Sequence, residues 1–510
     1  MGLGRTFAVS LVGLAGHLVE VEAQVVASVP SFVLVGLPDT ALSESRDRVR
    51  AAVTSCGISW PSRRITVSLS PASLPKSGSM FDLAVAVAIL AGAGQINPKH
   101  CRNVVHLGEL GLDGRLRPVR GILPAVARAV GAGMPSVVVP EANAAEARLV
   151  AGADVFGAVT LADVAHWHGG DVAPLTLPPA PALVTVGRSA PTADLADVIG
   201  QHEARRALEV AAAGGHHLLM VGPPGAGKTM LAARLPGILP DLADEESIEV
   251  TAIHSIAGTF DPSGGLVRRP PFEDPHHTAT PAAIVGGGSG TIRPGAASRA
   301  HRGVLFLDEA PEFSARVLQT LRQPLESGEI TIARAAGWFS FPARFQLVLA
   351  ANPCPCGAGQ GKMSSCTCSS LARRRYFGRL SGPLLDRVDL QVLVPPVPRA
   401  IALNGQPGES TAAVAARVAA ARASQQERLV DTPWRLNSEV PGRWLRERLR
   451  PRRGLLTELD SALDRGALTL RGVDRVLRVA WTLADLAGAN APTRDHIGEG
   501  YVLRTRGIAA

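Results

Sequence analysis

The sequence predicts an α/β protein in three parts, and three observations support this prediction. Residues 1–175 alternate short apolar runs with helical patterns, which is typical of strands that alternate with helices. Residues 198–396 surround a glycine-rich loop with further apolar strands, and residues 397–510 have mostly helical periodicity. Residues 176–197 are rich in Pro and Ala without periodicity, so they are predicted to be a linker.

The elements of the first part follow one another at short spacing. Apolar runs bounded by turn residues predict strands, and longer patterned stretches between them predict helices. Strands are expected at residues 32–36, 65–69, 104–107 and 137–139, and helices at residues 43–54, 81–91 and 123–132. Residues 7–16 are interpreted as a strand because the apolar run is too short for a signal peptide and Glu20 and Glu22 follow it.

Composition excludes several classes of protein. The chain has 510 residues, of which 46% are hydrophobic and 19% charged, so it is not wholly disordered. No apolar run approaches the ~18 residues of a membrane span, and six cysteines are too few for a disulfide scaffold of this length. We therefore expect a cytoplasmic protein that does not bind a membrane.

The net charge of +8 is weak evidence for nucleic acid, because only four of the 52 basic residues are Lys and an Arg skew often reflects genome composition. The basic excess is densest near the C-terminus, at Arg443, Arg446, Arg448, Arg450, Arg452 and Arg453. This cluster could meet phosphates or could be a solvated helix face.

The strongest motif is a glycine-rich loop between a predicted strand and a predicted helix over residues 230–235. Its residues are Gly222, Pro223, Pro224, Gly225, Ala226, Gly227, Lys228 and Thr229. Glycines let backbone N–H groups turn toward phosphates, and a helix N-terminus favours negative charge. Lys228 is expected to reach the β- and γ-phosphates, and Thr229 to bind Mg²⁺. The loop predicts a site for a nucleoside triphosphate.

Later apolar strands end in residues suited to hydrolysis. Asp308 is expected to hold Mg²⁺ through water, and Glu309 to polarise the attacking water as a general base. Asn352 could orient that water or sense the γ-phosphate. Arg387 is a candidate arginine finger and Arg471 a candidate lid arginine, although either could be a surface charge.

Four cysteines form two close pairs, Cys354 with Cys356 and Cys366 with Cys368. Four thiolates from two turns could bind Zn²⁺ tetrahedrally and clamp the segment after Asn352. The one-residue spacing within each pair is tighter than usual, so free thiols or transient disulfides are alternatives.

Together these motifs resemble a known family. The central part is similar to an AAA+ ATPase of the magnesium-chelatase-like group, and nearly the whole chain resembles the bacterial YifB/ComM proteins. The landmarks that carry the resemblance, in order, are residues 36–39 (GLPD), 43–51 (SESRDRVRA), 275–278 (PHHT), 286–289 (GGGS), 307–310 (LDEA), 342–345 (PARF), 352–357 (NPCPCG) and 381–387 (SGPLLDR).

The resemblance implies a motor that acts on DNA. The family is similar to ring-forming helicases that move branched DNA during natural transformation, so it implies ATP and Mg²⁺ as cofactors and self-association, expected as a hexamer. It also implies that Asn352 is sensor 1, that Arg471 is sensor 2, and that Arg387 acts on the nucleotide of a neighbouring subunit. The helical C-terminal part then corresponds to a lid.

The resemblance further implies two inserted hairpins that contact single-stranded or branched DNA. The hairpins are assigned to residues 286–298 and 328–341. Arg293, Arg334 and Trp338 are the candidate DNA contacts, because Arg neutralises phosphate and Trp can stack on a base. For Trp338, packing within the hairpin is an equal alternative.

The N-terminal part resembles the proteolytic domain of Lon, which has a ribosomal S5 domain 2-like fold. Residues 75–78 and 107–118 carry the resemblance. It implies that the nucleophile of a Ser–Lys dyad would fall at Met80 and its lysine at Leu123, and neither residue can perform that chemistry. We therefore expect a Lon-like domain without a catalytic dyad, acting as a structural or DNA-contact module.

Three other functions stay open. The chain could be the ATPase subunit of a metal (magnesium) chelatase, a MoxR-like chaperone that remodels proteins, or a nucleotide-gated scaffold without hydrolysis. A DNA motor predicts ATP turnover that DNA stimulates and salt suppresses, whereas a chelatase predicts neither. Glu309 and Arg387 argue against the scaffold.

Overall fold

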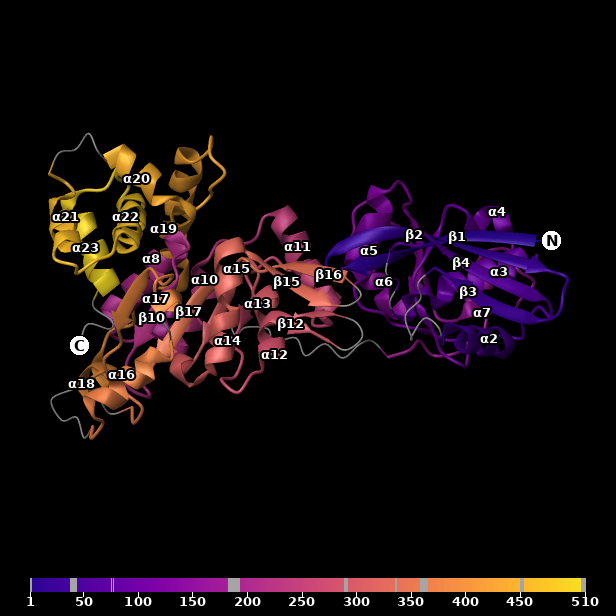
Figure 1. The fold of residues 1–510 in the computed structure, drawn as a ribbon, viewed down its shortest axis with the longest axis horizontal. Coiled ribbons are helices and arrows are strands. Elements are labelled where there is room, and N and C mark those ends of the chain that lie inside the picture. Colours follow the sequence, from indigo (N-terminus) through magenta and orange to yellow (C-terminus); the bar gives the residue numbers. More distant parts are fainter. Residues whose placement is uncertain are drawn as a thin grey trace.

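The computed structural model describes residues 2–36, 44–74, 76, 78–181, 193–288, 292–334, 337–357, 366–380, 382–449 and 454–505, and the statements below concern these residues. The molecule is elongated, with the N-terminal part at one end and the C-terminal helices at the other (Figure 1). Half of the predicted linker, residues 182–192, and residues 358–365 between the two cysteine pairs lie outside the described residues.

A mixed sheet of seven strands forms the N-terminal part, in the spatial order β3-β4-β2-β1-β5-β8-β9. The strands are β1 (Gly2–Val12), β2 (Ala15–Val26), β3 (Ser31–Val35), β4 (Arg64–Ser70), β5 (Val105–His106), β8 (Ser136–Pro140) and β9 (Asp154–Ala158). A separate small hairpin joins β6 (Glu109–Leu110) to β7 (Leu116–Arg117). β1 and β2 form a long antiparallel hairpin. The strand expected over residues 7–16 is confirmed for residues 7–12, but a turn at Gly13 and Leu14 separates β1 from β2.

Helices pack on this sheet between the strands: α2 (Ser45–Ser55), α3 (Asp82–Gly92), α4 (Pro98–Cys101), α5 (Ile122–Gly131), α6 (Glu141–Ala147) and α7 (Leu161–Trp167). The helices predicted near residues 43, 81 and 123 are confirmed as α2, α3 and α5. α3 is buried along its whole length, because its sequence is apolar on every face.

The central part is built on five parallel strands in the order β11-β14-β17-β10-β18. They are β10 (Leu218–Val221), β11 (Phe272–Glu273), β14 (Val304–Leu307), β17 (Gln346–Ala351) and β18 (Leu390–Leu393). Their almost continuous apolar sequences match burial on both faces of the sheet. Because β17 lies between β10 and β14, the carboxyl ends of these three strands meet at one edge.

Short helices cover the central sheet: α8 (His202–Gly214), α9 (Lys228–Ala232), α10 (Leu235–Ile238), α11 (Asp244–Ala257), α12 (Pro281–Val285), α13 (Ala296–Arg299), α14 (Ala315–Thr320), α15 (Arg322–Ser327), α16 (Ser370–Gly378) and α17 (Gly382–Leu385). A helix begins directly after the glycine-rich loop, as predicted, but the predicted span of residues 230–235 is interrupted at residues 233–234. Pro236 has no N–H and its ring crowds the carbonyl of Ala232, so α9 ends there and α10 starts anew.

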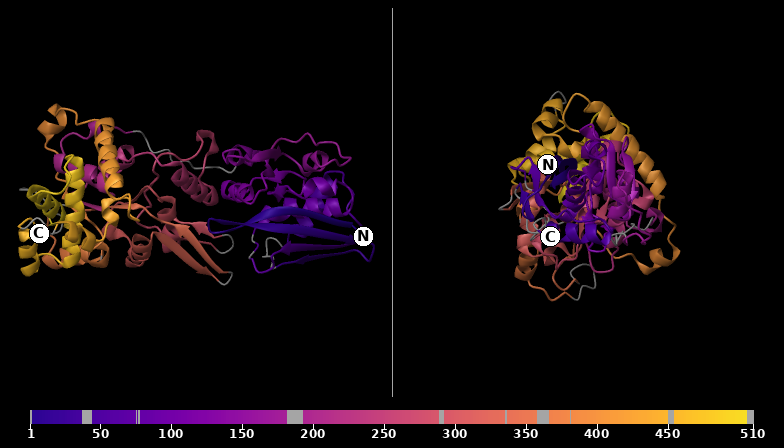
Figure 2. Two further views of the ribbon diagram at one scale, coloured as in Figure 1. Left: turned by 90° about the horizontal axis from the view of Figure 1, so that it is seen from above. Right: turned by 90° about the vertical axis from the view of Figure 1, so that its right-hand side faces the viewer.

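Antiparallel hairpins occupy both positions expected for inserts. β12 (Gly286–Gly287) pairs with β13 (Arg293–Pro294), and β15 (Glu329–Arg334) pairs with β16 (Gly337–Pro342). Both lie toward the N-terminal part in Figure 1, and in Figure 2 (left) the tip of the β1–β2 hairpin reaches β15 and β16.

The C-terminal part is helical, as predicted, with α18 (Arg399–Asn404), α19 (Thr411–Arg428), α20 (Gly442–Leu449), α21 (Thr457–Asp464), α22 (Leu470–Leu486) and α23 (Arg494–Thr505). α20 contains three arginines of the basic cluster noted in the sequence. Its arginines have partners within the chain: Arg443 lies 2.9 Å from Glu447, Arg446 pairs with Asp474, and Arg448 stacks on Trp444. In the described part of the chain, no helix combines the length and the apolarity that crossing a bilayer requires.

Candidate nucleotide site

The glycine-rich loop closes tightly around the ammonium group of Lys228. The Nζ atom of Lys228 donates hydrogen bonds to the carbonyl oxygens of Gly222 (2.7 Å) and Pro223 (3.0 Å), and to Oδ1 of Asn352 (3.1 Å). Burial lowers the pKa of Lys228, while the carboxylates of Asp308 and Glu309 act in the opposite direction. The ammonium group is partly removed from water and its partners are uncharged oxygens. Phosphate oxygens can therefore replace these partners at little cost in free energy.

At two positions of the loop, the backbone geometry explains why the residue is glycine. Gly222 passes so close to β18 that a Cβ on it would lie 2.2 Å from the carbonyl oxygen of Val394. Gly227 precedes α9 with a φ of 93°, a left-handed conformation that favours glycine. These two positions keep the loop compact at the carboxyl edge of the sheet, where α9 presents its N-terminus.

The residues predicted to bind Mg²⁺ lie together. Thr229 donates a hydrogen bond of 2.6 Å to Oδ2 of Asp308, and the other carboxylate oxygen accepts the backbone N–H of Glu309 (2.9 Å). A hydroxyl next to a carboxylate is a suitable oxygen pair for Mg²⁺, either directly or through water. Glu309 itself has a φ of 50°, which is uncommon for a residue with a side chain and turns its carboxylate away from the strand.

Sequence analysis missed one residue at this site, His277. Its Nδ1 lies 3.3 Å from Oε2 of Glu309, whose side chain is 49% exposed. The sequence pattern PHHT marked the position as a landmark of the family resemblance, but it did not indicate a place in the site. The histidine comes from the segment before α12, and only the folded chain shows that it faces the candidate general base.

Asn352 is held from two sides. Its side chain accepts the Lys228 hydrogen bond, and its backbone shares a hydrogen bond with the hydroxyl of Tyr376 from α16. Tyr376 is buried, and burial raises its pKa to about 12. The side-chain amide of Asn352 is therefore held next to the loop lysine, at the carboxyl edge of the sheet.

The four cysteines of the predicted zinc site converge directly after Asn352. Their sulfur atoms all lie within 4.8 Å of one another, and Cys354 Sγ is 3.2 Å from Cys356 Sγ and 3.5 Å from Cys366 Sγ. Four sulfurs bound to one Zn²⁺ at 2.3 Å would be about 3.8 Å apart, so the arrangement fits that ion with small adjustments. The cluster also supports the loop, because a Cβ on Gly357 would lie 2.9 Å from Pro224.

The two candidate arginines lie away from the glycine-rich loop of the same chain. Arg387 precedes β18, so it lies at the amino edge of the sheet, whereas the loop follows β10 at the carboxyl edge of the parallel neighbour. Four residues of strand separate the edges by about 13 Å. Burial lowers the pKa of Arg387, and the positive charges of Arg475, Arg471 and Arg322 add to this effect, although Glu326 forms an ion pair with it.

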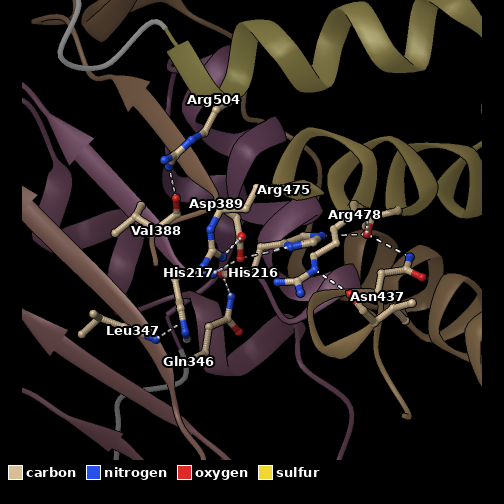
Figure 3. Close-up of polar contacts among 12 residues, drawn as sticks. His216, His217, Gln346, Leu347, Val388, Asp389, Asn437, Arg475, Arg478 and Arg504 are labelled. Atoms are coloured by element: carbon tan, nitrogen blue, oxygen red, sulfur yellow. Dashed lines mark hydrogen bonds and ion pairs between the residues drawn. The ribbon is translucent and has the colours of Figure 1, made fainter. Parts of the chain in front are cut away.

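The C-terminal helices are attached to the core at Asp389, two residues after Arg387, as Figure 3 shows for Asp389 and its partners. The carboxylate of Asp389 is buried, pairs with Arg475 of α22, lies 3.4 Å from Nδ1 of His216 and accepts the backbone N–H of His217 (3.3 Å). Burial alone would raise its pKa, but Arg475 and the two histidines hold that pKa well below its usual range. Arg504 of α23 donates to the carbonyl of Val388 in the same segment.

The candidate DNA residues lie on the two hairpins with exposed side chains. Arg293 begins β13, Arg334 ends β15, and Trp338 lies opposite Ala333 on β16. Trp338 is 74% exposed, so packing within its own hairpin does not explain it.

Among the described residues, apolar side chains occupy the two positions at which the Lon resemblance would place a Ser–Lys dyad. Met80 packs in the apolar core beside β1 and β5, and Leu123 is buried at the start of α5. The neighbouring hydroxyl of Ser79 donates to Glu109 and not to a lysine amine.

Fold and site define a class: an α/β protein with a glycine-rich phosphate loop on a parallel sheet, consistent with an AAA+ domain. Three family models match the chain: "Magnesium chelatase, subunit ChlI" over residues 194–402, "Subunit ChlI of Mg-chelatase" over 21–143, and "Magnesium chelatase, subunit ChlI C-terminal" over 408–504.

Relatives extend this result to the whole chain. An uncharacterized protein of Mycobacterium tuberculosis is 53% identical over 99% of both chains. Competence protein ComM of Haemophilus influenzae is 41% identical over 98% of this chain and 97% of its own. Lon protease of Trichlorobacter lovleyi is 26% identical over 26% of this chain and 16% of its own. The chain belongs to the YifB/ComM family of magnesium-chelatase-like proteins.

Proposed function

We propose that this protein is a ring-forming ATPase that couples ATP hydrolysis to movement along DNA, with branch migration during natural transformation or recombination as its task. The observation that carries the proposal is the division of the site between two edges of the sheet. Lys228 and Glu309 lie at the carboxyl edge, while Arg387 and Arg471 lie at or near the amino edge. A second copy would supply the missing arginines, and repeated contacts of this kind close a ring.

Within one subunit the proposed roles follow the geometry. The loop N–H groups and Lys228 hold the phosphates, and Thr229 with Asp308 holds Mg²⁺, which would neutralise phosphate charge. Glu309 takes the proton of the attacking water, while Asn352 orients that water beside the γ-phosphate. The exposed flank of Glu309 leaves room for the water, and His277 limits the positions its carboxylate can adopt.

The hairpins are the proposed DNA contacts. Arg293 and Arg334 would neutralise phosphates and Trp338 would stack on a base, in the pore of a ring expected to be a hexamer. The N-terminal part is proposed to be a Lon-like domain without protease chemistry, since an apolar Met80 and Leu123 occupy the positions of the dyad.

The first experiment measures ATP hydrolysis with no DNA, with single-stranded DNA and with a four-way junction, at two salt concentrations. We expect stimulation by DNA that fades as salt rises, because bound phosphates release counterions. Lys228→Ala should abolish both basal and stimulated turnover, since nothing else in the loop contacts the β- and γ-phosphates with a full charge. Turnover by the intact protein that ignores every DNA would overturn the proposal and favour the chelatase or chaperone class.

We also propose that Cys354, Cys356, Cys366 and Cys368 bind one structural Zn²⁺. The ion would tie the segment after Asn352 to the start of α16 and support Pro224 from behind. Its role would be to hold Asn352 in place, since four protein ligands leave no open position for chemistry.

Zinc analysis of the purified protein checks this assignment. We expect about one equivalent per chain, falling to near zero in Cys366→Ser, because three thiolates bind the ion far more weakly than four. Cys101→Ser changes a cysteine that is not in the cluster and should leave the zinc content unchanged. Equal zinc in both variants would contradict the assignment.

A further inference from the structure

We infer that Arg120, in the N-terminal part, belongs to the same phosphate-binding surface as Arg293 and Arg334. The N-terminal part would then hold the DNA strand directly, beside the hairpins of the ATPase part. This inference rests on the proposed DNA function and deepens it, because it gives the N-terminal part a role in binding the substrate.

The first observation is that the N-terminal part packs closely against the base of the β15–β16 hairpin. Leu11, Val12 and Leu14, around the β1–β2 turn, pack on the apolar cluster that contains Phe341. The approach is so close that a Cβ on Gly13 would lie 2.3 Å from the carbonyl oxygen of Ser340. Figure 2 (left) shows this meeting of the two hairpins.

A second contact fixes α11 against the N-terminal part. The hydroxyl of Ser255 donates to Oε1 of Glu146, which also accepts the backbone N–H of Leu123 at 2.9 Å. Ser255 and Glu146 are both buried. A buried polar contact of this kind is directional, so it sets the position of the neighbouring residues as well as their proximity.

The side chain of Arg120 extends from this contact region to the C-terminal end of α11. A Cβ on Gly258, which caps the helix, would lie 2.6 Å from Nε of Arg120. The helix C-terminus favours a cation and partly explains the position. However, Nη1 of Arg120 is buried and has no hydrogen-bond partner among the described residues.

The two inserted hairpins bring further arginines to the same region. Gly287 pairs with Arg293 across β12 and β13, and a Cβ on Gly287 would lie 3.5 Å from Nη2 of Arg334. Arg120 is linked to Arg293 through α11: a Cβ on Gly121 would lie 3.3 Å from Cγ1 of Ile256, and Ile256 shares an apolar cluster with Ile292, the residue before Arg293. The positive charge of Arg293 also adds to burial in lowering the pKa of Arg120. Three guanidinium groups from three separate segments therefore lie in one region.

Among the described residues, no ion pair compensates these charges. None of the three guanidinium groups pairs with Asp or Glu there, whereas several other arginines of the central part do. The hairpin turns that lie outside the described residues contain no acidic residue in the sequence. Like charges held together at a half-buried interface are costly, and a bound anion removes that cost.

The number and origin of the cations favour a nucleic-acid strand over a single phosphate ion. Arg120, Arg293 and Arg334 come from three separate segments, and spaced guanidinium groups suit the successive phosphates of a strand. The cavity of about 600 Å³ beside Trp338 is separate from them, because Trp338 and Arg334 point to opposite faces of the β15–β16 hairpin and Glu249 and Glu329 line that cavity together with Arg128. Arg120 would bind a phosphate adjacent to the one bound by Arg293.

Anisotropy of a fluorescently labelled oligo-dT strand tests this role in the full-length protein, with a non-hydrolysable ATP analogue, at several salt concentrations. We expect Arg120→Gln to weaken binding roughly tenfold. The slope of log affinity against log salt should fall by about 0.7, the value for one lost phosphate contact on a single strand. Arg102→Gln removes an equal charge from an exposed position at the far end of the N-terminal part and should change neither quantity.

Two further measurements separate a DNA contact from a loss of structure. ATP turnover without DNA should be unchanged in Arg120→Gln, because the residue is remote from the nucleotide site. Arg120→Lys retains the charge and should restore the salt slope of the original protein. An Arg120→Lys variant as impaired as Arg120→Gln would overturn the inference.

The outcomes also distinguish this inference from the proposed function. If the unaltered protein binds no DNA, the proposed function fails and the inference fails with it. If the unaltered protein binds DNA and Arg120→Gln binds equally well with the same salt slope, only the inference is overturned. If binding by Arg120→Gln is weaker only toward inorganic phosphate and not toward oligo-dT, the site is a phosphate-ion site and the inference is again overturned.

Discussion

Glu309→Gln is expected to lower ATP turnover by about 10²- to 10⁴-fold while the protein still binds ATP. The amide keeps the size of the side chain but cannot accept a proton from the attacking water. Lys228, Thr229 and Asp308, which are proposed to hold the phosphates and Mg²⁺, are unchanged. Lys228 keeps its contact with Asn352, and Thr229 keeps its contact with Asp308. The reaction should therefore stop after binding.

Single-turnover hydrolysis and binding of a fluorescent ATP analogue separate the two steps. Glu312→Gln is the matched control: it removes the same charge three residues away, from a side chain that pairs with Arg379 at the surface. Its turnover should stay close to that of the unaltered protein. Turnover of Glu309→Gln within a few fold of the original would contradict the general-base role and would favour a nucleotide-gated scaffold.

Arg387→Ala and Lys228→Ala should each be inactive alone and should regain activity when mixed. The two residues lie at opposite edges of the sheet, so they are proposed to act on different nucleotides. In a randomly mixed ring, roughly a quarter of the contacts join an intact loop to an intact Arg387. An arginine finger contributes about 10³-fold or more to hydrolysis, so recovery at these contacts should be easily measured.

The mixing experiment needs proof that subunits exchange, for which differently tagged variants can be purified together. Arg465→Ala, at an exposed position after α21, controls for the loss of a positive charge and should remain active alone. Mixed assemblies that form but stay inactive would show that Arg387 does not complete a neighbour's site. Full activity of Arg387→Ala alone would exclude it from hydrolysis altogether.

The sequence by itself determined the local parts of the candidate site. The loop at residues 222–229, the two acids and Asn352 each depend on a few adjacent residues at the end of an apolar strand, and local pattern is enough to recognise them. The helical C-terminal part was predictable for the same reason, whereas the two hairpins were implied by the family resemblance. The family resemblance also needed only motifs in their order.

Only the tertiary structure decided how these parts face one another. Strand order places β17 between β10 and β14, and this brings Asn352 next to Lys228 and leaves Arg387 across the sheet. His277 meets Glu309, and Arg120 approaches Arg293, through contacts between segments far apart in the chain. Periodicity reports whether a strand is buried, not which strand pairs with it, because pairing depends on backbone hydrogen bonds that every strand can form equally well.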